Sequence, residues 1–193
     1  MSDHPSTGSG KSSWDLVDTD ILWQKLNWPS DITVLDLGCG EGRYSLPAAA
    51  KVGPKGRVIA IDLWAEGIDR LKAAAVQQNM DNIDARVADA AGPLPLQDQS
   101  VDVCFMATVL HDFVVAGIAD RALREVTRVL KPRGIMAVVE FKKEDSPYGP
   151  PRRIRLAVED LAMMVQHLGF IRFSGVVDLG PDLYLSQFRR LAA

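Results

Sequence analysis

The fold is decided by one stretch, Thr33-Val34-Leu35-Asp36-Leu37-Gly38-Cys39-Gly40-Glu41-Gly42-Arg43-Tyr44-Ser45. Its first part is apolar and carries β-branched residues, which is typical of a buried parallel strand. The strand is expected to end at Gly38, and the apolar, alanine-rich run after Gly42 predicts a helix packed on the sheet. A strand, a glycine-rich turn and a helix in this order predict a site for a nucleotide-type ligand. The glycines let the backbone approach the ligand, and the first N–H groups of the helix face it without helical partners.

The spacing of the three glycines distinguishes between two kinds of ligand. A dinucleotide-binding turn has the pattern G-x-G-x-x-G, with the pyrophosphate at the helix N-terminus. Here the pattern is G-x-G-x-G, and Asp36 lies two residues before the first glycine. A carboxylate at this place favours a ligand with a cationic part over a pyrophosphate. S-adenosylmethionine is such a ligand, because it carries an ammonium, a sulfonium and one carboxylate that a helix N-terminus can hold.

The segment Asp36-Leu37-Gly38-Cys39-Gly40-Glu41-Gly42 resembles the first motif of class I S-adenosylmethionine-dependent methyltransferases, in the small UbiE-like branch. The resemblance covers about residues 30 to 190 and rests on four motifs in the family's order. It implies a doubly wound α/β domain with a seven-stranded Rossmann-like sheet, strand order 3-2-1-4-5-7-6, the last strand antiparallel and helices on both faces. It also implies methyl transfer by in-line displacement at the sulfonium of S-adenosylmethionine, with S-adenosylhomocysteine as the product.

The other three motifs lie further along the chain. A second buried strand, residues 57–62, ends in Asp62, whose carboxylate can accept both ribose hydroxyls of the cofactor. The pattern Pro-Leu followed by Asp-x-x-Val-Asp, in residues 95–102, precedes the fourth strand. The pattern Val-Leu-Lys-Pro-x-Gly, residues 129–134, ends a helix before the fifth strand, residues 135–141.

The resemblance implies which residues hold the cofactor. In the family an acid after the third strand faces the adenine amino group, and the next backbone N–H lies near a ring nitrogen; Asp89 and Ala90 match these positions. Leu63 is placed either for the adenine or for the core beneath it. The expected cofactor-binding residues are Asp36, Gly38, Cys39, Gly40, Gly42, Tyr44, Asp62, Leu63, Asp89, Ala90 and Met106, with Arg43 as a further candidate at the helix start.

The acceptor side of the site is expected at the end of the fourth strand, residues 100–109, because ligands bind outside the carboxyl ends of such strands. His111 and Asp112 follow directly and are the candidate catalytic residues, with His111 taking the acceptor's proton or orienting its attacking atom. Alternatively, His111 caps a short helix or only shapes the pocket. Tyr148, Arg152 and Arg155, with Arg153 beside them, could bind an anionic acceptor, and the alternative for this proline-rich segment is a solvated basic loop.

The remaining elements complete one domain over residues 14–193, after a flexible N-terminal tail, residues 1–13. An amphipathic helix at residues 14–28 either touches the substrate or simply covers the sheet. Further helices are expected at 118–130 and 156–168, and another one, which includes Ile68 and Leu71, ends at about residue 79. A third strand is expected at 84–89, and a final antiparallel hairpin from residues 170–177 and 183–190.

Composition restricts partners and location. The 193 residues are 47% hydrophobic and carry a net charge of −3, which predicts a globular protein without a basic footprint for nucleic acid. The expected partner is a small-molecule methyl acceptor, and a homodimer is one candidate assembly. No apolar run suits a membrane span or a signal peptide. Cys39 and Cys104 lack metal-ligand spacing, so reduced thiols, no metal site and a cytoplasmic location are expected.

Two other functions compete with methyl transfer. A nicotinamide-dependent reductase could use the strand–turn–helix unit and Asp62, but the glycine spacing, Asp36 and the terminal hairpin argue against it. A non-catalytic subunit or sensor that binds S-adenosylmethionine would share every feature of the cofactor site. Turnover on any acceptor would exclude this second alternative.

Overall fold

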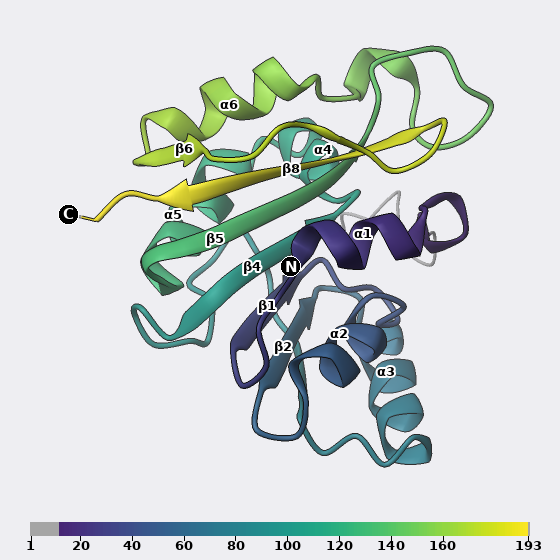
Figure 1. Cartoon of the computed structure of the whole chain (residues 1–193), viewed down its shortest axis with the longest axis vertical. Coiled ribbons are helices and arrows are strands. Elements are labelled where there is room, and N and C mark those ends of the chain that lie inside the picture. The colour runs from purple at the N-terminus through teal and green to yellow at the C-terminus, as the bar shows by residue number, and fades with distance from the viewer. Residues whose placement is uncertain (1–11, 193) are drawn as a thin grey trace.

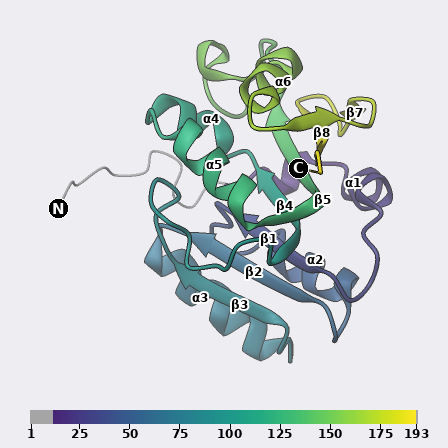
Figure 2. The same ribbon diagram turned by 90° about the vertical axis from the view of Figure 1, so that its left-hand side faces the viewer.

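The computed structural model describes residues 12–192, so the expected flexible tail lies almost entirely outside the described residues. One sheet runs through the molecule, with helices on both of its faces (Figures 1 and 2). The helices are α1 (Thr19–Leu26), α2 (Ser45–Val52), α3 (Ala65–Gln77), α4 (Leu110–Val115), α5 (Ala119–Val129) and α6 (Val158–Gln166), with 3₁₀ turns η1 (Trp14–Leu16) and η2 (Arg152–Ile154). The strands are β1 (Thr33–Leu37), β2 (Arg57–Asp62), β3 (Ile83–Val87), β4 (Val101–Ala107), β5 (Leu130–Phe141), β6 (Phe170–Arg172), β7 (Val177–Asp178) and β8 (Leu183–Arg190).

The strand order is β3-β2-β1-β4-β5-β8-β6, and the short β7 also pairs with β8. Strands β1 to β5 pair in parallel, whereas β8 runs antiparallel to β5. The expected doubly wound sheet with an antiparallel last strand is therefore confirmed. The first arm of the expected hairpin is divided into β6 and β7, so the sheet has eight strands in place of seven.

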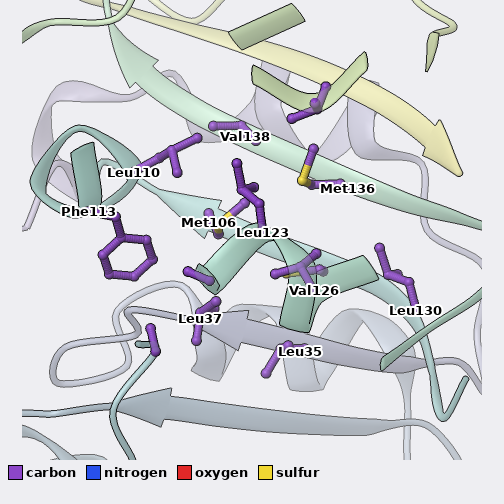
Figure 3. Close-up of a cluster of buried hydrophobic side chains, with 14 of the residues drawn as sticks. Leu35, Leu37, Met106, Leu110, Phe113, Leu123, Val126, Leu130, Met136 and Val138 are labelled. Atoms are coloured by element: carbon purple, nitrogen blue, oxygen red, sulfur yellow. The ribbon is translucent and has the colours of Figure 1, made fainter. Parts of the chain in front are cut away.

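The sheet separates two hydrophobic layers, because its strands are apolar on both faces. On one face, α4, α5 and α6 cover the larger layer; Figure 3 shows Leu123 and Val126 of α5 beside Leu35, Met106 and Met136 of the strands. On the other face, α1 and α2 cover a second layer that includes Leu22, Val34, Ala48, Phe105 and Val139. Helix α3 packs over β2 and β3 through Ile68 and Leu71.

Two boundaries differ from the sequence-based expectation. The helix expected at residues 14–28 is divided into η1 and α1, because Asp18 caps α1 by accepting a hydrogen bond from the N–H of Ile21 at 2.9 Å. Strand β5 begins at Leu130, five residues earlier than expected. Leu130 pairs with Val101 and Ile135 with Val103, and the four residues between them form an irregularity in the ladder.

Candidate active site

The glycine-rich turn joins β1 to α2 in the conformation that the glycines were expected to permit. Gly38, Gly40 and Gly42 have φ angles of 79°, 56° and 82°, in the left-handed region that other residues rarely adopt. A Cβ on Gly38 would lie 2.5 Å from a methyl group of Val109, and one on Gly42 would lie 2.2 Å from Leu71. A Cβ on Gly40 would meet no atom within 4 Å. Two glycines thus allow close packing, and the third presents its backbone to open space.

Asp62 connects the glycine-rich turn to the end of β2 through hydrogen bonds. Its carboxylate accepts hydrogen bonds from the N–H groups of Gly40 and Trp64, both at 2.8 Å. The carbonyl of Ile61, one residue earlier, accepts from Gly38 and Cys39. The predicted ribose-binding carboxylate is therefore held beside the open glycine, and it is half-buried.

Asp36 lies deeper, between β1 and the first turn of α2. Its side chain is buried and accepts a hydrogen bond from Ser45 Oγ at 2.5 Å. Burial raises the pKa of Asp36 to about 7, against the effect of the Ser45 hydrogen bond, and the charge of Asp62 adds to the increase. At neutral pH this carboxyl is thus divided between its two forms, and a cation beside it would favour the ionised form.

The residues expected around the adenine are divided between surface and core. Leu63 is 55% exposed directly after Asp62, which leaves an apolar side chain free for a ring. Asp89 is exposed and accepts from the N–H of Ala91 at 2.8 Å, and Ala90 is buried. Met106 is fully buried and its side chain packs in the core (Figure 3). Cys39 is also buried, and burial raises the pKa of its thiol, so that it stays neutral.

Tyr44 and Arg43 connect the turn to the N-terminal segment. The hydroxyl of Tyr44 is 2.9 Å from that of Ser13, which also accepts a hydrogen bond from Thr108 Oγ1 at 3.1 Å. Burial raises the pKa of Tyr44 to about 12. Arg43 makes two hydrogen bonds to Asp15, at 2.5 and 2.7 Å. Sequence reasoning missed this connection, because Ser13 lies 31 residues from its partner and carries no signal of its own.

His111 and Glu140 form a buried pair on the acceptor side. Glu140, in β5, accepts a hydrogen bond from the main-chain N–H of His111 at 3.1 Å and is 2.8 Å from its Nδ1. Burial opposes the charge on His111, but the hydrogen bond to Glu140 and the charges of Glu140 and Asp112 hold the pKa of the imidazole above its usual range. Glu140 was not among the expected site residues, although a lone acid within an apolar strand signals a buried partner.

The two candidate catalytic residues differ in environment. His111 is buried, whereas Asp112 is partly exposed, with its Oδ1 3.6 Å from Nε2 of His111. Both lie in the first turn of α4, directly after Val109, whose side chain packs against Gly38. The structure therefore brings the histidine and the glycine turn to the same edge of the sheet.

The three residues expected to bind an anionic acceptor are not equivalent. Arg155 is buried, and its guanidinium donates to four carbonyl oxygens of its own loop: Pro150, Lys142, Glu144 and Tyr148, at 2.8, 3.1, 2.9 and 2.5 Å. Arg152 is exposed and donates to the carbonyl of Lys143, and the side chain of Tyr148 is 53% exposed. Arg155 thus holds the loop together, while the other two side chains face solvent.

These residues fit the groups of S-adenosylmethionine. The backbone of Gly40 faces open space beside Asp62, a carboxylate suited to ribose hydroxyls, and the exposed apolar side chain of Leu63 follows Asp62. A second acid suited to a cation, Asp36, lies in β1 and is buried. Across residues 12–192, no group of three or more His, Cys, Asp or Glu side chains is placed to hold a metal ion. Within the same residues, no helix combines the length and apolar character that crossing a membrane requires.

Comparison with known proteins shows the family to which the chain belongs. Residues 29–168 match a family described as "Methyltransferase domain". An arsenite methyltransferase of Halobacterium salinarum is 35% identical over 169 residues, which are 81% of this chain and 40% of that protein. A demethylmenaquinone methyltransferase of Lactobacillus johnsonii is 32% identical over 127 residues, which are 65% of this chain and 50% of that protein. The chain thus spans two fifths to a half of these relatives.

A solved structure extends the similarity to almost the whole chain. An S-adenosylmethionine-dependent methyltransferase from Aquifex aeolicus superposes with a TM-score of 0.84 and 26% sequence identity. The match covers 98% of this chain and 95% of that one. The sheet order, including the antiparallel last strand, is therefore shared with a chain of nearly the same extent.

Proposed function

This chain belongs to the methyltransferase-domain family, and on that premise we propose that it transfers the methyl group of S-adenosylmethionine to a small-molecule acceptor, an activity of class EC 2.1.1.-. The observation that carries the proposal is the open face of Gly40, whose N–H is held by Asp62 at the end of β2, together with a second acid, Asp36, in β1 beneath α2. A pyrophosphate would be repelled by both acids. A ligand with ribose hydroxyls and an ammonium is complementary to them.

Each part of the cofactor has a proposed set of residues. Asp62 would hold the ribose hydroxyls, and Leu63, Asp89 and Ala90 would surround the adenine. Asp36 would face the ammonium, with the main chain of the glycine turn around the rest of the amino-acid part. When bound, S-adenosylmethionine supplies a methyl group activated by a sulfonium. The residues of the chain then need only hold acceptor and methyl in line and exclude competing water.

His111 and Asp112 are proposed for the acceptor side. The contact of Val109 with Gly38 supports this assignment, because it joins the start of α4 to the glycine turn. Tyr148 and Arg152 are the solvent-facing candidates for contact with the acceptor. Arg155 would act on the acceptor indirectly, by fixing the loop that carries them.

A small molecule is the proposed acceptor for two reasons. The similar proteins described above are named for arsenite and for demethylmenaquinone. The net charge of −3 also disfavours a nucleic acid. A cytoplasmic location is proposed from the two cysteines, which are free and buried thiols in the structure, and a homodimer stays a prediction.

The proposal is tested by turnover. The purified protein is incubated with S-adenosylmethionine and one of four acceptors, arsenite with a thiol, a demethylmenaquinol, catechol or glycine, and S-adenosylhomocysteine is measured. We expect formation that depends on at least one acceptor and is lost in Asp62→Asn. Binding of S-adenosylmethionine without turnover on any acceptor would favour the non-catalytic subunit instead.

A further inference from the structure

Glu140 is a fully buried acid in the second part of β5, residues 135–141, which is otherwise apolar, and its partner is His111. Its side chain is 0% exposed, between Val139 and Phe141 in β5. Burying a carboxylate is costly unless it is hydrogen-bonded, and an apolar residue would fit this strand at lower cost. Both carboxylate oxygens are used on His111, one by its main-chain N–H and one by Nδ1. The acid is therefore placed to hold this one side chain.

The hydrogen bond determines which nitrogen of His111 carries the proton. A carboxylate can only accept, so Nδ1 must donate, and the neutral imidazole then keeps the lone pair on Nε2. Within the described part of the chain, Nε2 has no hydrogen-bond partner, and Asp112 Oδ1 lies 3.6 Å from it. The geometry leaves a basic nitrogen available near the edge of the sheet where the glycine turn lies.

We propose that Glu140 is a positioning residue that holds His111 in the Nδ1–H tautomer, so that Nε2 accepts a proton from a hydroxyl or thiol acceptor. This inference rests on the proposed methyl transfer. The acceptor's O–H or S–H bond breaks and its proton moves to Nε2. The electron pair left on oxygen or sulfur forms the new bond to the methyl carbon, and the pair of the old sulfur–methyl bond stays on the sulfonium sulfur.

The charged groups around the pair determine its pH dependence. Glu140 from β5 and Asp112 from α4 favour the imidazolium, whereas burial and Arg155, which follows η2, oppose it. Tyr184 of β8 is the cross-strand neighbour of Glu140 and donates its hydroxyl to the carbonyl of Leu156. Since the pKa of His111 is raised overall, the base form becomes the main form only above a pH that is higher than the ordinary pKa of a histidine. Turnover on a hydroxyl or thiol acceptor should rise with pH through that value.

The test measures the pKa and the tautomer of the His111 imidazole directly, by ¹⁵N NMR of the full chain with labelled histidine, titrated from pH 5 to 9. The chain has three histidines, so His111→Asn identifies the signal. We expect a pKa above the ordinary value of about 6.5 and, in the neutral form, the proton on Nδ1. Glu140→Gln should lower the pKa and move the proton to Nε2, because the amide can donate to Nδ1. The matched control Glu159→Gln, at an exposed site on α6, should change neither.

Turnover gives the second readout. With a hydroxyl or thiol acceptor that is turned over, such as catechol, Glu140→Gln should lower kcat on the order of 100-fold and move the rise with pH to lower pH. Its dissociation constant for S-adenosylmethionine should stay within about twofold of wild type. A wild-type His111 with its neutral proton on Nε2 overturns the inference even if the variant fails to fold. Absence of S-adenosylmethionine binding would instead overturn the proposed function.

Discussion

The carboxyl group of Asp36 lies beneath the first turn of α2, where burial raises its pKa to about 7. An ordinary aspartate is fully ionised at that pH, so its attraction for a cation does not vary there. Asp36 is only partly ionised at that pH, so a bound ammonium would have to shift its carboxyl group to the carboxylate form. Its folded pKa lies above the ordinary value, so protonation competes with cation binding as the pH falls through about 7.

This linkage predicts a pH-dependent affinity. The affinity for S-adenosylmethionine should rise about tenfold from pH 5.5 to pH 7, a range in which the ligand's own ammonium stays protonated. Calorimetry at matched ionic strength measures this affinity at each pH. Asp36→Asn should bind more weakly and without this pH dependence, whereas Asp69→Asn, at an exposed site on α3, should keep it. A wild-type affinity that is independent of pH would show that Asp36 only anchors α2 through Ser45.

At the residue scale, the sequence predicts what is local and misses what is not. The glycine turn lies within one continuous segment, so the conformation and open face of Gly40 could be predicted from spacing. The partner of His111 is 29 residues away, and only the pairing of β4 with β5 brings Glu140 beside it. For Arg155 the sequence offered either contact with an anionic acceptor or a solvated basic loop, and its burial among four carbonyls is a property of the folded loop.

The loop between β5 and α6, residues 142–157, has little regular structure beyond η2 and depends on Arg155. Removing this guanidinium would leave four carbonyl oxygens without their donor. The ring of Phe141 also lies under the guanidinium, 5.4 Å from its carbon atom, and would lose that contact.

We therefore expect Arg155→Ala to loosen the loop without weakening the cofactor site. Chymotrypsin should cleave after Tyr148 at least about tenfold faster than in wild type, because cleavage follows the population of the open loop. Affinity for S-adenosylmethionine should not change. The matched control is Arg153→Ala, an exposed neighbour in the same loop, which should leave the cleavage rate as it is. Equal cleavage of Arg155→Ala and wild type would mean that the loop is held by other contacts.

Element types were predictable from periodicity, and their ends depended on single residues. The apolar runs of β1 and β2 and the amphipathic α5 follow directly from the sequence. The end of η1 and the start of α1 are decided by the cap at Asp18, which the periodicity of apolar residues does not reveal. Likewise, Pro132 and Gly134 predicted the end of a helix, but nothing in the sequence pattern indicated that Leu130 already pairs with β4.

At the scale of the molecule, the site is assembled from segments that are distant in sequence. Gly40 and Asp62 lie at the carboxyl ends of β1 and β2, and His111 and Glu140 lie at those of β4 and β5. The order β3-β2-β1-β4-β5 puts these four ends at one edge, with β1 and β4 adjacent. The sequence predicted that edge through the family's strand order, and the division of the hairpin into β6 and β7 required the structure.

The measurement that tests the central claim most directly is a calorimetric titration of wild type and Asp62→Asn with S-adenosylmethionine, S-adenosylhomocysteine and NADH. Micromolar binding of the first two, and none of NADH, is the predicted result. Asp62→Asn should weaken both by on the order of 10- to 100-fold, since removing a charged hydrogen-bond acceptor costs about 1–3 kcal/mol. Tight binding of NADH alone, or equal affinity of Asp62→Asn and wild type, would contradict the assignment of the glycine turn to S-adenosylmethionine.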